Sequence, residues 1–169
     1  MSDRTPAEQG ASAPASPPGP EPGPLDAPEP AAHRALPHTA DTILQAWAAT
    51  RRGCLREAVL ALVDSFAAPP SAASPAAGRT VTFSVGPAAD DEQLVAVLDE
   101  ALYAIDALGV VPVDVTVRPT PDGGLDGVFT AVPVDRVEVV GAVPKAVAYS
   151  DLVFACEGGL WRCRFTVDV

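Results

Sequence analysis

The sequence contains little positive charge. A single lysine, Lys145, and ten arginines face 22 acidic residues, which gives a formal net charge of −11. Proteins that hold nucleic acids draw most of their affinity from clustered Lys and Arg. The composition therefore predicts no direct nucleic-acid binding. It favours a basic protein partner, bound cations, or an acidic surface that serves solubility alone.

Signatures of several protein classes are also missing. No apolar run approaches the roughly 18 residues of a membrane helix, and the N-terminus resembles no signal peptide, so we expect a cytoplasmic protein without membrane contact. Phosphate-binding glycine loops and the GxSxG motif of serine hydrolases are absent. The three cysteines form no CxxC pair, which argues against a disulfide framework or a zinc knuckle.

Proline is abundant and unevenly distributed. Nine of the 19 prolines lie in residues 1–30, interleaved with Ala, Gly, Ser and Glu. Such a segment buries too little apolar surface to offset the entropy of ordering. We predict a disordered Pro/Ala-rich arm over residues 1–35 and a single domain over 36–169. A second low-complexity segment, residues 67–78, is predicted to be a long loop.

Hydrophobic periodicity predicts two helices and six strands. Thr50 is predicted to cap a helix with apolar positions from Cys54 to Phe66. Asp90 is predicted to cap a second helix, with Gln93 in the capping-box position and Gly109 as its stop. The predicted strands are residues 41–48, 79–85, 111–118, 127–132, 145–156 and 160–169, the last two forming a hairpin around 157–159. This order predicts an α+β domain whose mainly antiparallel or mixed sheet is covered by two amphipathic helices.

Acidic residues at strand ends are the first candidates for chemistry. Asp41 follows His38 where the first predicted strand begins, and such a pair can ligate a metal or exchange a proton. A hydrogen-bonded turn explains the same residues. Asp168 ends the polar face of the last strand, beside the terminal carboxylate of Val169. A cation would relieve the repulsion between the two groups, although a solvated strand end is the plain alternative.

Two further candidates are weaker. Lys145 is the only lysine, and an exposed charge at a strand edge explains it equally well. Asp99 and Glu100 flank the apolar stripe of the second helix, where acidic residues are usually only solvated.

Four segments together resemble the archease family. HTAD at 38–41 opens the first strand, and LDEALYAIDALG at 98–109 is similar to the family's Leu-Asn-Glu-Leu-Leu-Tyr helix. PKAVAYSDLVF at 144–154 is similar to its Lys-Ala-Val-Thr-Tyr-His strand, and TVDV at 166–169 resembles its Asp-Ile ending. The resemblance runs from about Leu36 to the last residue. Thr42, Ala148 and Ser150 depart from the family pattern.

The resemblance implies an accessory protein rather than an enzyme. Archeases promote the guanylylation and multiple turnover of the GTP-dependent RNA ligase that acts in tRNA splicing and RNA repair. The resemblance implies that Asp41 and Asp168 bind a divalent cation, calcium or magnesium, and that Lys145 is functional. Glu100 and His38 are motif residues whose roles are carried over less directly.

Two other functions remain open at this point. The chain can be a chaperone-like or structural interaction module, in which a metal only stabilises the fold. A hydrolase that uses Asp41 with His38 is the weaker alternative, because no nucleophile or oxyanion element accompanies them.

Overall fold

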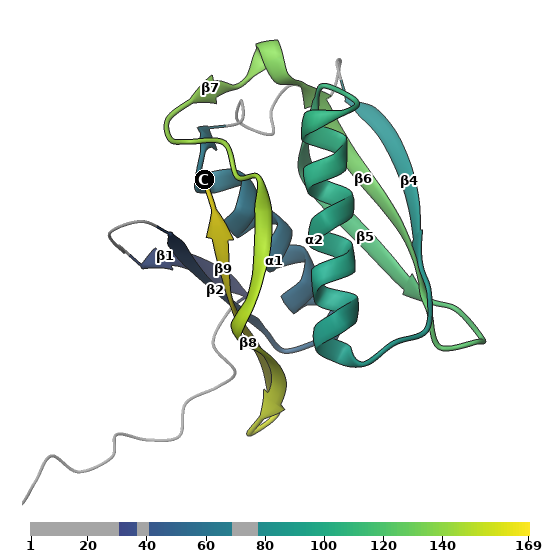
Figure 1. The fold of residues 1–169 in the computed structure, drawn as a ribbon. Coiled ribbons are helices and arrows are strands. Elements are labelled where there is room, and N and C mark those ends of the chain that lie inside the picture. Colours follow the sequence, from purple (N-terminus) through teal and green to yellow (C-terminus); the bar gives the residue numbers. More distant parts are fainter. Residues whose placement is uncertain (1–30, 37–40, 69–77) are drawn as a thin grey trace, which may run out of the picture.

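The computed structural model describes residues 31–36, 41–68 and 78–169 (Figure 1). The described chain has the expected α+β organisation, with two helices and antiparallel sheets. The described strands form two main sheets and a short two-stranded one, rather than a single sheet. The four-stranded sheet has the order β1-β2-β9-β8, and the three-stranded sheet has the order β4-β6-β5.

The helices and strands have the following bounds. The four-stranded sheet contains β1 (Ala32–Leu36), β2 (Thr42–Ala48), β8 (Ala146–Glu157) and β9 (Leu160–Asp168). The three-stranded sheet contains β4 (Arg79–Val85), β5 (Val110–Pro119) and β6 (Leu125–Pro133). The helices are α1 (Arg51–Asp64), α2 (Asp90–Asp106) and the 3₁₀ turn η2 (Val134–Arg136), and the short strands β3 (Ala67–Ala68) and β7 (Glu138–Val139) pair with each other.

Two predicted boundaries need correction. Residues 32–35 were assigned to the disordered arm, but they form β1, which pairs with β2 along its whole length. Residues 67 and 68 were assigned to a loop, but they form β3. The rest of both predictions, residues 1–30 and 69–77, falls outside the described residues.

The helix caps confirm one prediction and correct another. Thr50 caps α1 as predicted, because its hydroxyl accepts a hydrogen bond from the Gly53 amide at 3.0 Å. In α2 the capping position is Ala89 rather than Asp90, and the Glu92 carboxylate accepts from the Ala89 amide at 3.2 Å. Gln93 is therefore free to turn inward, where its amide donates to the backbone carbonyls of Gly86 and Gly123.

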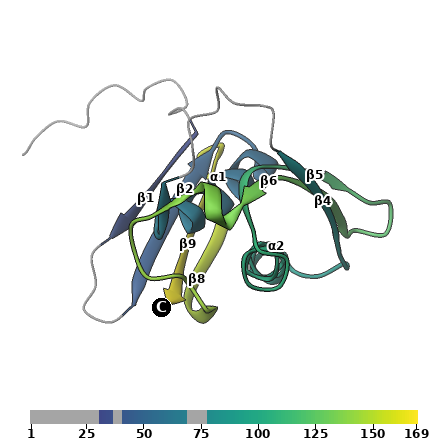
Figure 2. The ribbon, with the colours of Figure 1, turned by 90° about the horizontal axis from the view of Figure 1, so that it is seen from above.

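Both helices lie between the two sheets. Figure 2 looks along α2 and shows it between β8 on one side and β4 and β5 on the other. α1 packs against β2, β9 and β5, so the two sheets share one core. Fully buried side chains from both sheets and both helices meet there, among them Leu44, Leu55, Leu98, Phe129 and Phe165. Neither helix in the described part of the chain is long and apolar enough to cross a membrane.

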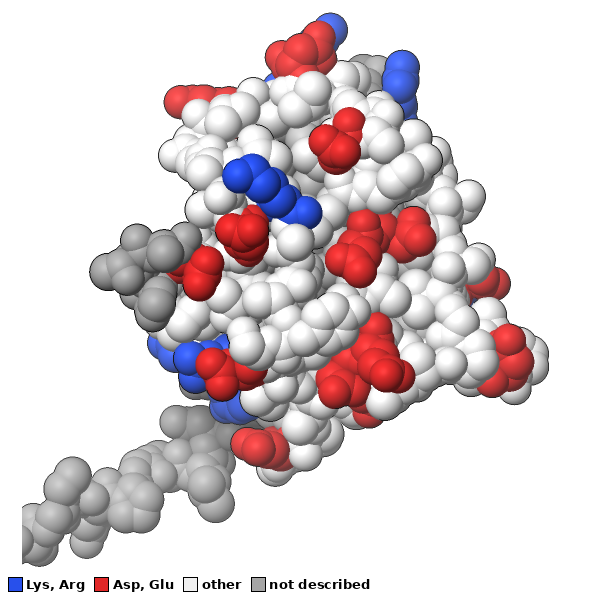
Figure 3. Space-filling view, in the orientation of Figure 1, with Lys and Arg blue, Asp and Glu red and all other residues white. Residues whose placement is uncertain are grey.

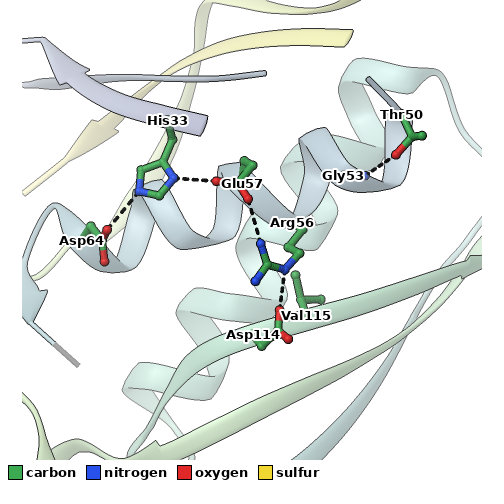
Figure 4. Close-up of polar contacts among 8 residues, drawn as sticks. All are labelled: His33, Thr50, Gly53, Arg56, Glu57, Asp64, Asp114 and Val115. Atoms are coloured by element: carbon green, nitrogen blue, oxygen red, sulfur yellow. Dashed lines mark hydrogen bonds and ion pairs between the residues drawn. The ribbon is translucent and has the colours of Figure 1, made fainter. Parts of the chain in front are cut away.

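A polar network fastens β1 to α1 across the edge of this core (Figure 4). The His33 ring contacts carboxylates through both nitrogens, Nδ1 to Glu57 at 2.8 Å and Nε2 to Asp64 at 2.9 Å. Glu57 is buried and also accepts a hydrogen bond from the Arg56 guanidinium. The same guanidinium donates to Asp114 of β5. Because a neutral imidazole donates from only one nitrogen, two carboxylate acceptors select the imidazolium form.

The pKa of His33 reflects this geometry. Burial by itself lowers the pKa, but the hydrogen bonds to Glu57 and Asp64 and their negative charges outweigh burial and raise it. The contact of charged His33 with Glu57 and Asp64 thus holds β1 against α1, and the sequence pattern alone did not predict this strand.

Replacing His33 by Gln is expected to lower the free energy of unfolding at pH 6 by about 1 kcal/mol, since partial exposure weakens such bonds. The pKa is raised on folding, so the stabilisation is complete below the unfolded value of 6.5 and is lost as pH rises through the folded pKa. Urea unfolding at pH 6 and pH 9 should therefore show that the difference in free energy of unfolding between the unchanged protein and His33→Gln is smaller at pH 9. The control variant Ser84→Ala loses the hydrogen bond to Asp126. Its difference in free energy of unfolding from the unchanged protein should be the same at both pH values. If the difference for His33→Gln were the same at pH 6 and pH 9, His33 would not be held as an imidazolium between Glu57 and Asp64.

A glycine beneath an aromatic ring fixes the packing of the three-stranded sheet. Phe83 of β4 pairs with Gly127 of β6, and its ring stacks on Phe129 with centroids 4.4 Å apart. A Cβ at position 127 would collide with the Phe83 ring.

Gly127→Ala is accordingly expected to lower the free energy of unfolding by about 1–3 kcal/mol, because the Phe83 ring must leave its position in a close-packed core. Gly78→Ala is the matched control, since its new methyl would make only ordinary contacts, with Thr130 at 3.5 Å and the Ala131 carbonyl oxygen at 4.0 Å. Chemical denaturation of both variants provides the measurement, and equal stabilities would show that the ring yields without cost.

Candidate functional site

The site is built by the pairing of β9 with strands on both of its sides. Thr42 of β2 pairs with Val167, so the next residue outward, Asp41, continues the register opposite Asp168. On the other side Ala146 of β8 pairs with Asp168, and the Lys145 amide donates to the Asp168 carbonyl at 2.8 Å. The two ladders bring Asp41, Lys145 and Asp168 to one strand-end corner, although Asp41 precedes the other two by more than a hundred residues.

The donor set at this corner suits a hard cation. Asp41 is half-buried and Asp168 is exposed, and both carry carboxylate oxygens, which calcium and magnesium prefer. Val169, half-buried against the core, is the next residue. Within the described ranges no group of three His, Cys, Asp or Glu side chains converges to hold a metal. The two aspartates would thus supply only part of a coordination shell, and Val169 or water would have to complete it.

The structure places only one of the two remaining predicted residues. His38 lies outside the described residues, so the structure does not place it. Glu100 is half-buried on α2 and is not among the residues that line the neighbouring groove.

A groove of about 760 Å³ runs beside the corner, between α2 and the beginning of β8. Lys145 lines it and connects the groove with the strand-end corner. Figure 3 shows this face of the molecule, on which acidic side chains predominate and a basic one lies where β8 begins. The groove is lined by Asp99, Leu102, Tyr103, Ile105, Asp106, Val143, Pro144, Lys145, Ala146, Val147 and Tyr149.

An irregularity in β8 shapes the groove. Ala148 pairs with Thr166 and Val153 pairs with Arg164, so residues 149–152 of β8 face a single residue of β9. The extra residues form a wide bulge in which Asp151 has a positive φ of 56°. Tyr149, 70% exposed, projects from this bulge into the groove, opposite Tyr103 of α2, which is 57% exposed.

Sequence reasoning missed the groove residues of α2. Asp99, Tyr103 and Asp106 follow one another at intervals of four and three residues, the signal of a single helix face. Asp99 is exposed, as the sequence predicts. Its partial desolvation at the groove nevertheless raises the pKa of Asp99 above its usual 3.8. The spacing of these three residues therefore indicated a shared helix face, but the sequence did not show that β8 lies opposite this face.

The comparisons with known proteins agree with this fold and these motifs. A sequence model of the archease protein family matches residues 33–169. A protein of Mycobacterium tuberculosis named "Probable protein archease" is 44% identical over 137 residues, covering 81% of this chain and 74% of its own length, and the same holds for the protein of a second strain. The chain belongs to the archease family.

Two solved structures share the fold at low sequence identity. Protein 1598 of Methanobacterium thermoautotrophicum aligns with a TM-score of 0.59 and 23% identity, covering 81% of this chain and 98% of its own. The Thermotoga maritima protein, described as an archease and possible chaperone, aligns with a TM-score of 0.56 and 15% identity over 80% of this chain and 96% of its own. The family match begins at His33, in agreement with the corrected start of the domain in β1.

Replacing Asp99 by Asn is expected to raise the melting temperature at pH 7. A carboxyl whose pKa is raised by folding weakens the native state above the folded pKa and has no such effect below the unfolded value of 3.8. The gain should therefore vanish near pH 3. Asp135→Asn, at an exposed position of η2, should change neither melting temperature. A loss of stability in Asp99→Asn at pH 7 would show that the carboxylate is stabilised by a partner instead.

Proposed function

We propose that this protein is a metal-dependent accessory protein, without catalysis of its own, that activates a GTP-dependent RNA ligase in the cytoplasm. Its role would be to promote guanylylation and multiple turnover of the ligase in tRNA splicing or RNA repair. Family membership gives the general class. The observation that carries the more specific proposal is the convergence of Asp41, Asp168 and Lys145 at one corner of the four-stranded sheet.

The cation would be calcium or magnesium, held by Asp41 and Asp168. Val169 is the proposed source of a third carboxylate oxygen, and water would fill the remaining positions. A bound divalent ion would supply electrostatic attraction for a phosphate or carboxylate of the partner. This chain's own contribution is to fix both carboxylates on the ends of paired strands, so that little ordering is needed on binding.

Lys145 would contact the partner beside the cation. Its backbone is fixed by the bond to the Asp168 carbonyl, while its side chain is exposed and lines the groove. A positioned ammonium group can bind a phosphate of the guanylate or an acidic side chain of the ligase. The largely acidic surface around it would steer a basic RNA-binding enzyme toward the corner.

Asp41→Asn and Asp168→Asn test the proposal with minimal change of shape. In a guanylylation assay with GTP, excess RNA ends and the partner ligase, both variants should reduce the stimulated turnover to the rate of the ligase alone. Asp135→Asn removes the same charge from an exposed position and should stimulate fully. A second measurement needs no ligase: added calcium should raise the melting temperature of the unchanged protein, and less so that of the two variants.

The two measurements separate the proposal from its alternative. Full stimulation by both variants would refute the ligase proposal. A calcium-dependent rise in melting temperature without any effect on the ligase would instead support the interaction module in which the metal only stabilises the fold.

A further inference from the structure

The face of the four-stranded sheet that points away from α1 carries a basic and aromatic surface. Leu44 and Ala46 of β2 are buried toward α1, so the alternate residues Gln45 and Trp47 lie on the outer face. Arg34 of β1 pairs with Gln45, and Gln45 pairs with Arg164 of β9. One register step along, Trp47 pairs with Arg162. Three arginines thus surround one tryptophan on a protein of net charge −11.

This surface is hollowed rather than flat. A depression of about 390 Å³ is lined by Arg34, Gln45, Ala46, Trp47, Arg162, Cys163 and Arg164. Among these described lining residues none is acidic. Arg34 is held in place, because its Nε donates to Gln45 Oε1 at 2.9 Å and its guanidinium lies 5.8 Å from the Trp47 ring centroid. Arg162 also interacts within the protein, so Arg34 and Arg164, both exposed, are the main candidates for an outside ligand.

We propose that this hollow binds a short stretch of single-stranded nucleic acid. Arg34 and Arg164 stand on either side of β2, about 10 Å apart by strand spacing, and their side chains can reach a phosphate between them or two in succession. The planar guanidinium of Arg34 and the indole of Trp47 provide the π surfaces on which an unpaired base stacks. The volume accommodates about one nucleotide.

The charge of the whole protein limits the length of this ligand. The expectation that an acidic chain does not bind nucleic acid rested on average composition, whereas three of the ten arginines lie together on one sheet face. A long polyanion would also meet the acidic surface elsewhere and be repelled. Only an end or a short unpaired segment would gain from two arginines without that cost. An acidic peptide would satisfy the arginines but would not use the aromatic ring of Trp47 beside Arg34.

Fluorescence anisotropy with a labelled single-stranded hexa-adenylate tests this inference on the full chain. At 50 mM salt we expect measurable binding whose log K falls with log salt with a slope of about −0.7 to −1.4, as for one or two phosphate contacts on a single strand. Arg164→Glu should weaken binding at least tenfold, since it replaces an attraction by a repulsion. Arg34→Glu should weaken binding to the same extent, and it should also remove the guanidinium that lies against the Trp47 ring. Bound adenylate should quench the fluorescence of Trp47, and Trp47→Phe should lose that quenching.

The control is Arg79→Glu, which makes the same change of charge at an exposed position of the other sheet and should bind as the unchanged protein does. The inference is overturned if Arg164→Glu binds as well as Arg79→Glu does. It is also overturned if a poly-glutamate peptide competes as effectively as the oligonucleotide, which would identify an acidic protein segment as the ligand. The measurement is independent of ligase stimulation, so either proposal can fail alone.

Discussion

The hydrogen-bond ladders of β9 are the constraint on which the site depends. β9 is bonded on one side to β2 and on the other to β8, so its register fixes two distant parts of the chain at once. In an antiparallel pair a shift of one residue would move every side chain of a strand to the opposite face. The buried alternation of Cys163, Phe165 and Val167 excludes such a shift. The packing of three apolar side chains therefore also determines where Asp41 and Lys145 stand relative to Asp168.

Local sequence signals predicted those elements whose causes are local. The stripe that follows Thr50 and the alternation along β9 each contain enough information within a few residues. β1 could not be predicted in this way, because Ala32–Leu36 follows a proline-rich stretch and has no clear alternation. What stabilises it is pairing with β2 and the contact of His33 with Glu57 and Asp64, which lie 24 and 31 residues away. Its cause is tertiary.

The candidate site divides along the same line. Asp41, Asp168 and Lys145 were identified from motifs, and only the registers of β2 and β8 showed that they share a corner. The groove was not predicted, because it needs α2 and β8 together and because the bulge at residues 149–152 has no clear sequence signal. Ala148 and Ser150, two departures from the family pattern, lie at the start of this bulge and within it. Two of the three named departures thus lie where the strand leaves its partner and the groove begins, and the third, Thr42, lies at the start of β2.

The distribution of charge gives two regions around the four-stranded sheet different chemistry. At the strand-end corner and along the groove, Asp41, Asp99 and Asp106 keep the potential negative, which favours cations and basic partners. Around the arginines on the outer face of β1, β2 and β9 the sign of the charge reverses locally. Arg164 and Asp168 are four residues apart on β9, about 13 Å by strand rise, which exceeds the screening length of about 8 Å at physiological salt. Net charge is an average over both surfaces and describes neither. A protein of this kind can attract an anionic ligand and a basic partner simultaneously, because the arginines and the aspartate corner lie at different positions along β9.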